Sequence, residues 1–326
     1  MSEPLPRRVA VIGAGTMGAG IGLSFALAGA TTSVVSRSET TLARARHQID
    51  SSLALLLEHD RVTHAQAAAA AARIVLSTEL PGAVDGAGLV VESIIEELDA
   101  KQRVLTEVSS LAPVHAIIAT NTSSLPLDTL ARSVTQPQRF AGMHWFNPPE
   151  LVELVELAPA PHTAPTTMER LLAWSLAAGK RPVRIARPVP GLIANRLQYA
   201  LMREAYALVS AGVCDFDAID TAVTAGLGPR WAAIGPIESM DLAGLDVHLA
   251  VAGALFPTLN GAHDAPDVVR DAVQQGRLGA KSGEGLRGSY DEARIAAIAR
   301  RRAQSLLGAT QPERAAVDQR APYPAS

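Results

Sequence analysis

Three polar side chains near the middle of the chain have the types and spacing needed for acid–base chemistry. Ser123 lies in ATNTSSLP, His144 in GMHWFNPP and Glu156 in LVELVEL. A carboxylate that holds an imidazole orients it and raises its basicity, so the imidazole can take a proton from an alcohol. We therefore expect Glu156 to pair with His144; the alternative is that Glu156 is a carboxylate on a sheet edge.

A glycine-rich turn near the start of the chain has the spacing of a dinucleotide site. VAVIGAGTMGAG follows a predicted strand directly and opens a predicted helix. Glycines in G-x-G-x-x-G spacing permit a tight turn, close approach of the backbone to a pyrophosphate, and close packing of helix on strand. The expected cofactor contacts are Gly13, Gly15, Thr16, Met17 and Gly18. The alternative is a purely structural turn.

The end of the second predicted strand bears on the choice of nicotinamide cofactor. An acid usually stands there and binds the adenine ribose, but TTSVVSRSE places Ser36 and Arg37 at this point. Loss of the carboxylate removes its repulsion of a 2′-phosphate, and a guanidinium can grip that phosphate. The sequence favours NADP without excluding NAD. In the alternative, Arg37 is solvated and Glu39 reaches the ribose.

The elements that must position these residues alternate in the first half of the chain. Short apolar runs are separated by helical patterns, which predicts right-handed βαβ units and a mostly parallel sheet. The expected strands are Arg8–Ile12, Thr32–Ser36, Ile74–Leu76, Leu89–Ser93, Ala116–Thr120, Arg139–Met143 and Leu151–Leu157. The expected helices are Met17–Ala28, Thr40–Leu57 with an extension through the alanine run, Asp99–Ser110 and Thr166–Ala178.

From Pro190 onward the pattern becomes helical, and RIARPVPG is a plausible hinge. The expected helices are Leu192–Ala211, Asp215–Ala225, Ile237–Phe256 and Tyr290–Leu307. The fold class is therefore α/β, with an N-terminal Rossmann sheet over residues 1–187 and an all-α domain over residues 188–308. Residues 309–326 lack apolar periodicity and are predicted to be a disordered tail.

Composition excludes several classes of protein. The net charge of −3 gives no electrostatic footprint for nucleic acid or an anionic membrane. The only cysteine, Cys214, rules out an intrachain disulfide, and the bland interpretation is a half-buried structural thiol. No histidine pair has zinc-ligand spacing and no run is long enough to span a membrane. We expect a cytoplasmic enzyme without a metal.

The motifs together resemble the 3-hydroxyacyl-CoA dehydrogenase family. They are GAGTMGAGI, NTSSL, MHWFNPP, LVELVEL and PGLIANRL, in this order, and the similarity runs from about Arg8 to Gly285. The resemblance implies a Rossmann domain, a helical domain that forms a homodimer, and a His–Glu catalytic pair. It implies hydride transfer between a nicotinamide and the C3 carbon of a 3-hydroxyacyl-type substrate, as in fatty acid metabolism.

The resemblance also implies roles for single residues. His144 matches the general base, Glu156 the acid that polarises it, and Ser123 the serine that contacts the substrate oxygen and the histidine. The remaining matches are Asn195 with the asparagine that holds the reacting carbonyl, Glu96 and Lys101 with the pair next to the nicotinamide ribose, and Asn121 with a residue that lines the cleft. The alternatives are a solvated lysine for Lys101 and a helix cap for Asn195.

The chain departs from the family in ways that concern the substrate. Coenzyme A-binding members place lysines after the position of Ser52, where this chain continues LALLLEH. GLGPRWAAIGPIESMDLAG resembles the branch with L-gulonate 3-dehydrogenase and lambda-crystallin, which handles free hydroxy acids. There Arg230 would clamp a carboxylate, or else be a surface or capping arginine. Leu286 and Arg287 stand where an aromatic pair normally follows KSG-G.

Two other functions stay open. The first is a crystallin-like protein that binds cofactor without turnover. The second is an NADP-dependent reductase of another carbonyl or an imine substrate. A complete set of Ser123, His144, Glu156 and Asn195 favours an active dehydrogenase, because a structural protein has no need of it.

Overall fold

The computed structural model describes residues 4–309, and the described chain forms two compact units that divide between Asn195 and Arg196. The sequence placed this boundary near Arg187. The predicted tail falls almost entirely outside the described residues, and its first residue, Ala309, ends the last helix.

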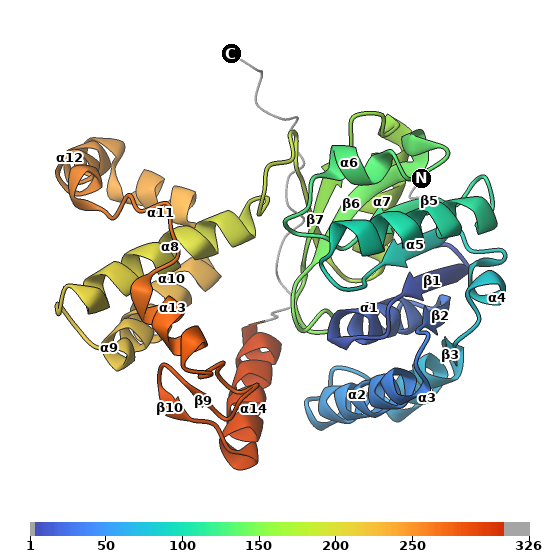
Figure 1. Ribbon diagram of the computed structural model, residues 1–326, viewed down its shortest axis with the longest axis horizontal. Coiled ribbons are helices and arrows are strands. Elements are labelled where there is room, and N and C mark those ends of the chain that lie inside the picture. Colours follow the sequence, from blue (N-terminus) through green and yellow to red (C-terminus); the bar gives the residue numbers. More distant parts are fainter. Residues whose placement is uncertain (1–3, 310–326) are drawn as a thin grey trace. The chain divides into compact units, whose positions relative to one another are not determined.

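The first unit is built on an eight-stranded sheet of order β3-β2-β1-β4-β5-β6-β7-β8 (Figure 1). The strands are β1 (Arg8–Ile12), β2 (Thr31–Val35), β3 (Ile74–Ser77), β4 (Leu89–Glu92), β5 (Ile117–Thr120), β6 (Phe140–Trp145), β7 (Leu154–Pro159) and β8 (Arg181–Arg184). All neighbours pair in parallel except β6 with β7. The expected doubly wound, mostly parallel sheet is confirmed, and its direction of winding changes between β1 and β4.

Two strands differ most from the sequence expectation, and β6 runs two residues further than the expected Arg139–Met143, so that it includes His144. β7 begins at Leu154 rather than Leu151, because Leu151 and Val152 close a turn by donating their N–H groups to the carbonyl of Pro148. β8 was not predicted: its sequence RPVR is polar and contains a proline, which suits only the edge position that it occupies.

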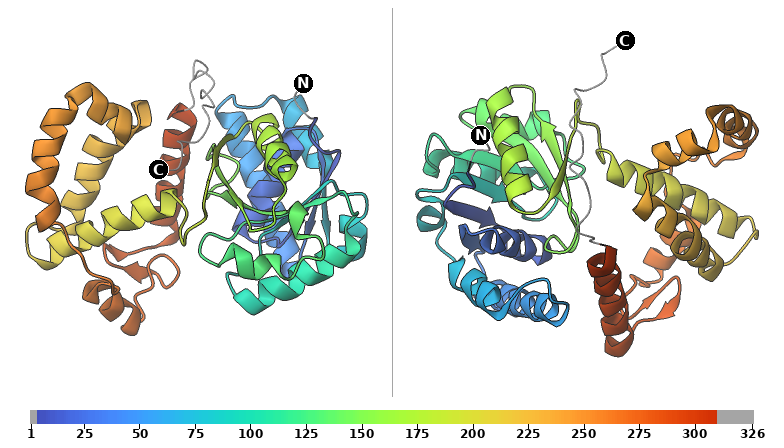
Figure 2. Two further views of the ribbon diagram at one scale, coloured as in Figure 1. Left: turned by 90° about the horizontal axis from the view of Figure 1, so that it is seen from above. Right: turned by 180° about the vertical axis from the view of Figure 1, so that it is seen from behind.

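Helices cover both faces of this sheet (Figure 2). One face packs against α1 (Thr16–Leu27), α2 (Glu39–Glu58), α3 (His64–Arg73) and α7 (Pro165–Ala177); the other packs against α4 (Leu80–Val84), α5 (Leu98–Leu111) and α6 (Leu127–Ala131). The apolar strand residues divide into two clusters accordingly. Near-continuous apolar strands such as β4 and β5 are buried on both faces, as a parallel sheet requires.

The second unit is mainly helical, as expected. Its helices are α8 (Ala194–Ser210, which begins in the first unit), α9 (Phe216–Thr221), a π-helical stretch (Ala222–Leu227), α10 (Gly228–Ala233), α11 (Pro236–Ala243), α12 (Leu245–Leu255), α13 (Asp267–Gln274) and α14 (Glu292–Ala309). The predicted helix Ile237–Phe256 is broken at Gly244, whose φ of 97° leaves the helical region. A two-residue hairpin of β9 (Glu284–Gly285) and β10 (Gly288–Ser289) is an addition to the all-α expectation.

Candidate active site

The centre of the site is a buried pair on β6 and β7. Antiparallel pairing sets His144 directly opposite Glu156, so both side chains lie on the same face of the sheet. The Nδ1 atom of His144 lies 2.9 Å from Oε2 of Glu156. The ring of Phe146 packs edge-on against the imidazole at 4.5 Å. The other ring nitrogen makes no hydrogen bond to any described residue.

The start of α8 holds the second oxygen of Glu156. The backbone N–H groups of Ile193 and Ala194 donate to Oε1 at 3.0 and 2.9 Å. Burial raises the pKa of Glu156, but the hydrogen bonds from His144, Ala194 and Ile193 outweigh it and leave the pKa below its ordinary value. The carboxylate therefore stays charged at neutral pH and fixes the imidazole. Because β7 lies between β6 and β8, Glu156 is not on a sheet edge.

Asn195 follows these two amides on α8. The helix begins at Ala194, so Asn195 is not its cap. Its half-buried amide makes no hydrogen bond within residues 4–309. The structure therefore places this amide one residue from the backbone groups that hold the carboxylate of Glu156.

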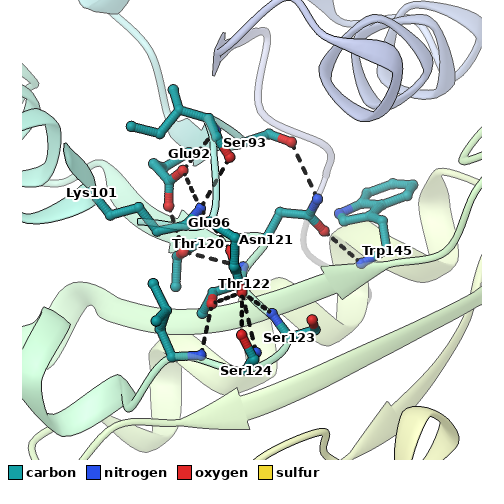
Figure 3. A network of polar contacts seen from close by, with 12 residues as sticks. Glu92, Ser93, Glu96, Lys101, Thr120, Asn121, Thr122, Ser123, Ser124 and Trp145 are labelled. Atoms are coloured by element: carbon teal, nitrogen blue, oxygen red, sulfur yellow. Dashed lines mark hydrogen bonds and ion pairs between the residues drawn. The ribbon is translucent and has the colours of Figure 1, made fainter. Parts of the chain in front are cut away.

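The loop that carries Ser123 is organised by a single carboxylate oxygen (Figure 3). Oε1 of Glu96 accepts hydrogen bonds from the Thr122 hydroxyl at 2.5 Å, from the N–H groups of Ser123 and Ser124, and from the Ser124 hydroxyl. Burial raises the pKa of Glu96, yet the bond from Thr122, the charge of Lys101 and the remaining bonds lower it overall. The Ser123 hydroxyl has no partner among the described residues.

Behind this loop lies a carboxylate that the sequence analysis missed. Glu92 ends β4 fully buried; its Oε1 lies 2.7 Å from the ammonium of Lys101 and its Oε2 accepts from the Thr120 hydroxyl at 2.6 Å. Lys101 also lies 3.3 Å from Glu96. Lys101 is 1% exposed, so it is not a solvated helix lysine. Its expected place beside the ribose stays a prediction. The sequence did contain one sign of Glu92: it is a charged residue that ends the apolar strand LVVE.

Asn121 ties together the ends of three strands. Its amide nitrogen donates to the hydroxyl of Ser93, after β4, and its oxygen accepts from the backbone N–H of Trp145, at the end of β6 (Figure 3). Asn121 itself follows β5. The residue fixes the carboxyl edge of the sheet next to His144.

The glycine turn fits a dinucleotide. Gly13 has a φ of 111°, and a side chain on Gly18 would collide with the carbonyl of Gly13. Nothing lies within 4 Å of where a side chain on Gly15 would begin. Gly15 caps α1, and no side chain occupies the free amides of the first turn. An open helix N-terminus at the β1–β4 switch point is the arrangement that accepts a pyrophosphate. Gln48 of α2, which the sequence analysis did not single out, bonds the carbonyl of Thr16 at 2.9 Å.

The loop after β2 carries no acid. The hydroxyl of Ser36 accepts from the backbone N–H of Ser38, and Ser38 caps α2. Arg37 and Glu39 are both exposed. This geometry fits a loop in which Arg37 binds a 2′-phosphate, and it fits equally a loop in which Arg37 is solvated and Glu39 reaches the ribose.

The turn between β6 and β7 is held by Lys180, another residue that the sequence analysis missed. Lys180 donates to the carbonyls of Pro149 and Val152 at 2.5 and 3.1 Å, and its ammonium lies 5.4 Å from the centre of the Trp145 ring. Burial lowers its pKa to about 8, against the opposing charges of Glu150 and Glu153. Its partners are backbone carbonyls, which leave no sequence signal.

Two residues of the second unit were also singled out. Arg230 lies exposed on α10, directly after the π-helical stretch, and its role as a carboxylate clamp stays a prediction. Arg287, which replaces an aromatic residue of the family pattern, forms ion pairs with Asp217 and Asp220 near α9. This position therefore anchors the β9–β10 hairpin to a helix.

Comparison with known proteins decides the family. Residues 8–188 match the family model described as "3-hydroxyacyl-CoA dehydrogenase, NAD binding domain". Residues 191–288 match the model of the C-terminal domain of the same family. The chain belongs to the 3-hydroxyacyl-CoA dehydrogenase family. Its members are oxidoreductases with a nicotinamide cofactor, which agrees with the function expected from the sequence.

Three of the similar proteins in this family are informative. A 5-formyl-3-hydroxy-2-methylpyridine 4-carboxylate 5-dehydrogenase of Mesorhizobium japonicum is 33% identical over 86% of this chain and 90% of its own, and human mitochondrial hydroxyacyl-coenzyme A dehydrogenase is 34% identical over 86% and 91%. A crystal structure of a 5-formyl-3-hydroxy-2-methylpyridine 4-carboxylic acid 5-dehydrogenase, described as an NAD+-dependent dismutase, is similar to this chain with a TM-score of 0.87 and 31% identity. The similarity covers 93% of this chain and 97% of that one. (S)-3-hydroxybutyryl-CoA dehydrogenase of Ralstonia eutropha has a TM-score of 0.71, 32% identity, and coverage of 88% and 99%.

Within residues 4–309 no single helix is long and apolar enough to cross a membrane; α11 and the segment Leu245–Thr258 reach that length only as a pair bent by 113°. The same residues contain no group of three or more His, Cys, Asp or Glu side chains placed to hold a metal ion.

Lys180 supplies a test of this arrangement. Lys180→Met leaves the carbonyl of Val152 without a side-chain donor and that of Pro149 with only the 3.4 Å bond from Ser24, and we expect the free energy of unfolding at pH 7 to fall by about 2 kcal/mol. Because the pKa of Lys180 is lowered to about 8 from 10.5, the unfolded chain binds the extra proton between these values. Wild-type stability should therefore rise relative to the variant from pH 8 to 10.5 in urea titrations. Parallel pH curves would show that Lys180 titrates normally.

Proposed function

We propose that this chain moves a hydride between a nicotinamide and the C3 carbon of a 3-hydroxy acid, with His144 as the base. The observation that carries this proposal is the buried His144–Glu156 pair at 2.9 Å, in which one imidazole nitrogen is held and the other is free. An imidazole in this state accepts the proton of an alcohol or returns it to a carbonyl oxygen. The free nitrogen also argues for turnover rather than a crystallin-like role.

The remaining polar groups of the site suit the oxygen that reacts. The Ser123 hydroxyl and the Asn195 amide both lack partners among the described residues, and each can donate to an oxygen that gains negative charge. Glu156 stays anionic and stabilises the protonated imidazole. The turn from Gly13 to Gly18 would hold the cofactor, which supplies the hydride acceptor when bound.

A free carboxylate at the other end of the substrate is favoured over a coenzyme A thioester. The stretch from Ser52 to His59 contains no lysine or arginine for a nucleotide phosphate. The buried Ser52 hydroxyl donates to Glu150 at 2.5 Å, so the charged side chain beside this stretch is an acid. The relative from Mesorhizobium japonicum is named for a pyridine carboxylate substrate. Comparison of 3-hydroxybutyrate with 3-hydroxybutyryl-CoA, followed at 340 nm, tests the preference.

His144→Gln is the direct test of the chemistry. We expect kcat with a turned-over 3-hydroxy acid or thioester to fall roughly 10³-fold, because a general base is lost. Cofactor affinity, measured by nicotinamide fluorescence, should stay unchanged. His115→Gln, which alters an exposed histidine of the same unit, serves as the control. Near-normal turnover in His144→Gln would contradict the proposal.

The loop after β2 supports a proposal that NADP is the preferred cofactor. Ser36 removes the acid that would repel a 2′-phosphate, and the exposed Arg37 is free to approach one. The family description names NAD for this domain, so the preference would belong to this chain's own loop.

Ser36→Asp should reverse this preference. In the wild type we expect kcat/KM to be higher with NADP⁺ than with NAD⁺, and the variant should lower the NADP⁺ value about tenfold or more because the new carboxylate repels the phosphate. Arg37→Met should lower the NADP⁺ value alone. A wild-type preference for NAD⁺ would refute the proposal.

A second copy of the chain is the partner that α11 and α12 favour. Ile237, Leu242 and Leu249 are 77%, 75% and 74% exposed, and no residue of α12 is buried. Apolar faces of this extent mark association surfaces. Leu249→Glu should convert a homodimer to monomers in sedimentation velocity runs, whereas Val114→Glu, on the first unit, should not. A wild-type monomer would rule out the proposal.

A further inference from the structure

A cavity of about 570 Å³ lies in the first unit beside Ser123. Three segments enclose it: the loop from Thr122 to Asp128, the turn after β7 at Pro159–Pro161, and the connection 186–190 with Leu192. Gly142 of β6 belongs to its floor. Its volume is within the range of small-molecule sites.

The cavity lies on the same face of the sheet as the catalytic pair. Gly142 pairs with Ala158, and His144 pairs with Glu156 one step further along the same two strands. Side chains two residues apart on a strand point to the same face. A side chain on Gly142 would come within 3.0 Å of Leu127, so glycine keeps this floor bare while α6 packs against it.

Ser123 joins the cavity to the catalytic groups. Its carbonyl accepts the N–H of Gly191 at 3.0 Å, which ties the serine loop to the connection that leads into α8. Ser123 lines the cavity, and its hydroxyl lacks a partner among the described residues. An oxygen bound to this hydroxyl would therefore have the rest of its molecule at the rim of the cavity.

The lining selects an apolar ligand. Leucine, valine and proline side chains make up most of the walls, and the only charged lining residues, Asp128 and Arg187, are both exposed. Five of the lining residues are prolines, whose fixed φ makes the walls stiff before a ligand arrives.

We propose that this cavity receives the apolar chain of the substrate beyond its hydroxyl-bearing carbon, with Leu125 and Val189 setting the length accepted. The inference rests on the proposed function, because it assumes a 3-hydroxy substrate at His144. The carboxyl end of the substrate then points away from the cavity, whose walls would not solvate a charge.

Chain-length profiles test this assignment. Racemic 3-hydroxybutyrate and 3-hydroxyoctanoate, with their coenzyme A thioesters, are compared by kcat/KM in the wild type and in Val189→Phe. Each buried methylene is worth about fourfold, so the wild type should favour the eight-carbon substrate by about tenfold or more. Val189→Phe narrows the cavity and should lower the ratio of the eight-carbon to the four-carbon kcat/KM by about fivefold or more relative to the wild type.

Controls separate the possible failures. Val114→Phe makes the same exchange at a residue that is 74% exposed and does not line the cavity, and should keep the wild-type profile. Leu125→Phe provides a second narrowed cavity if Val189→Phe is unstable. Octanoate should inhibit the wild type more strongly than either narrowed variant. Activity with an unchanged profile in both narrowed variants would overturn this inference alone, whereas no wild-type activity on any of these substrates would overturn the proposed function.

Discussion

The buried hydrogen bond between His144 and Glu156 is the interaction on which the rest of the site depends. A carboxylate that is 1% exposed is costly unless its oxygens are bonded. Here the imidazole binds one oxygen and two amides at the start of α8 bind the other. The pair of His144 and Glu156 therefore needs both the antiparallel register of β6 with β7 and the return of the chain to the sheet at Ile193.

The same solution recurs at the neighbouring strand ends. Glu92 is a fully buried carboxylate that would be costly without a partner, whereas Glu96 is exposed, and both bind Lys101. Glu96 uses its other oxygen to gather four donors of the loop that carries Ser123. Fixed charges thus hold the serine loop before any substrate binds, so little reorganisation is left for the reaction itself.

The turn between β6 and β7 also packs against α1. The side chains of Pro149 and Glu150 fill the space that a side chain on Gly20 would need, which makes this glycine of α1 a contact residue rather than part of the phosphate turn. The Ser24 hydroxyl and the Lys180 ammonium share the carbonyl of Pro149. The helix α1, which would bear the pyrophosphate, and the strand β6, which carries His144, are therefore parts of one packed body.

By itself the sequence determined the alternation of strands and helices, the glycine turn and the pairing of His144 with Glu156, because local periodicity and residue type carry that information. Tertiary structure decided which groups support them. Glu92 and Lys180 become central only when strands far apart in sequence bring carbonyls and loop amides to them. The break at Gly244 and the edge strand β8 were missed for a related reason: a backbone conformation and an edge position are properties of the folded chain. The sequence reveals a residue that can react because reactivity is a property of its own side chain. It does not reveal the contacts that position that residue, because those contacts come from neighbours that only the fold brings together.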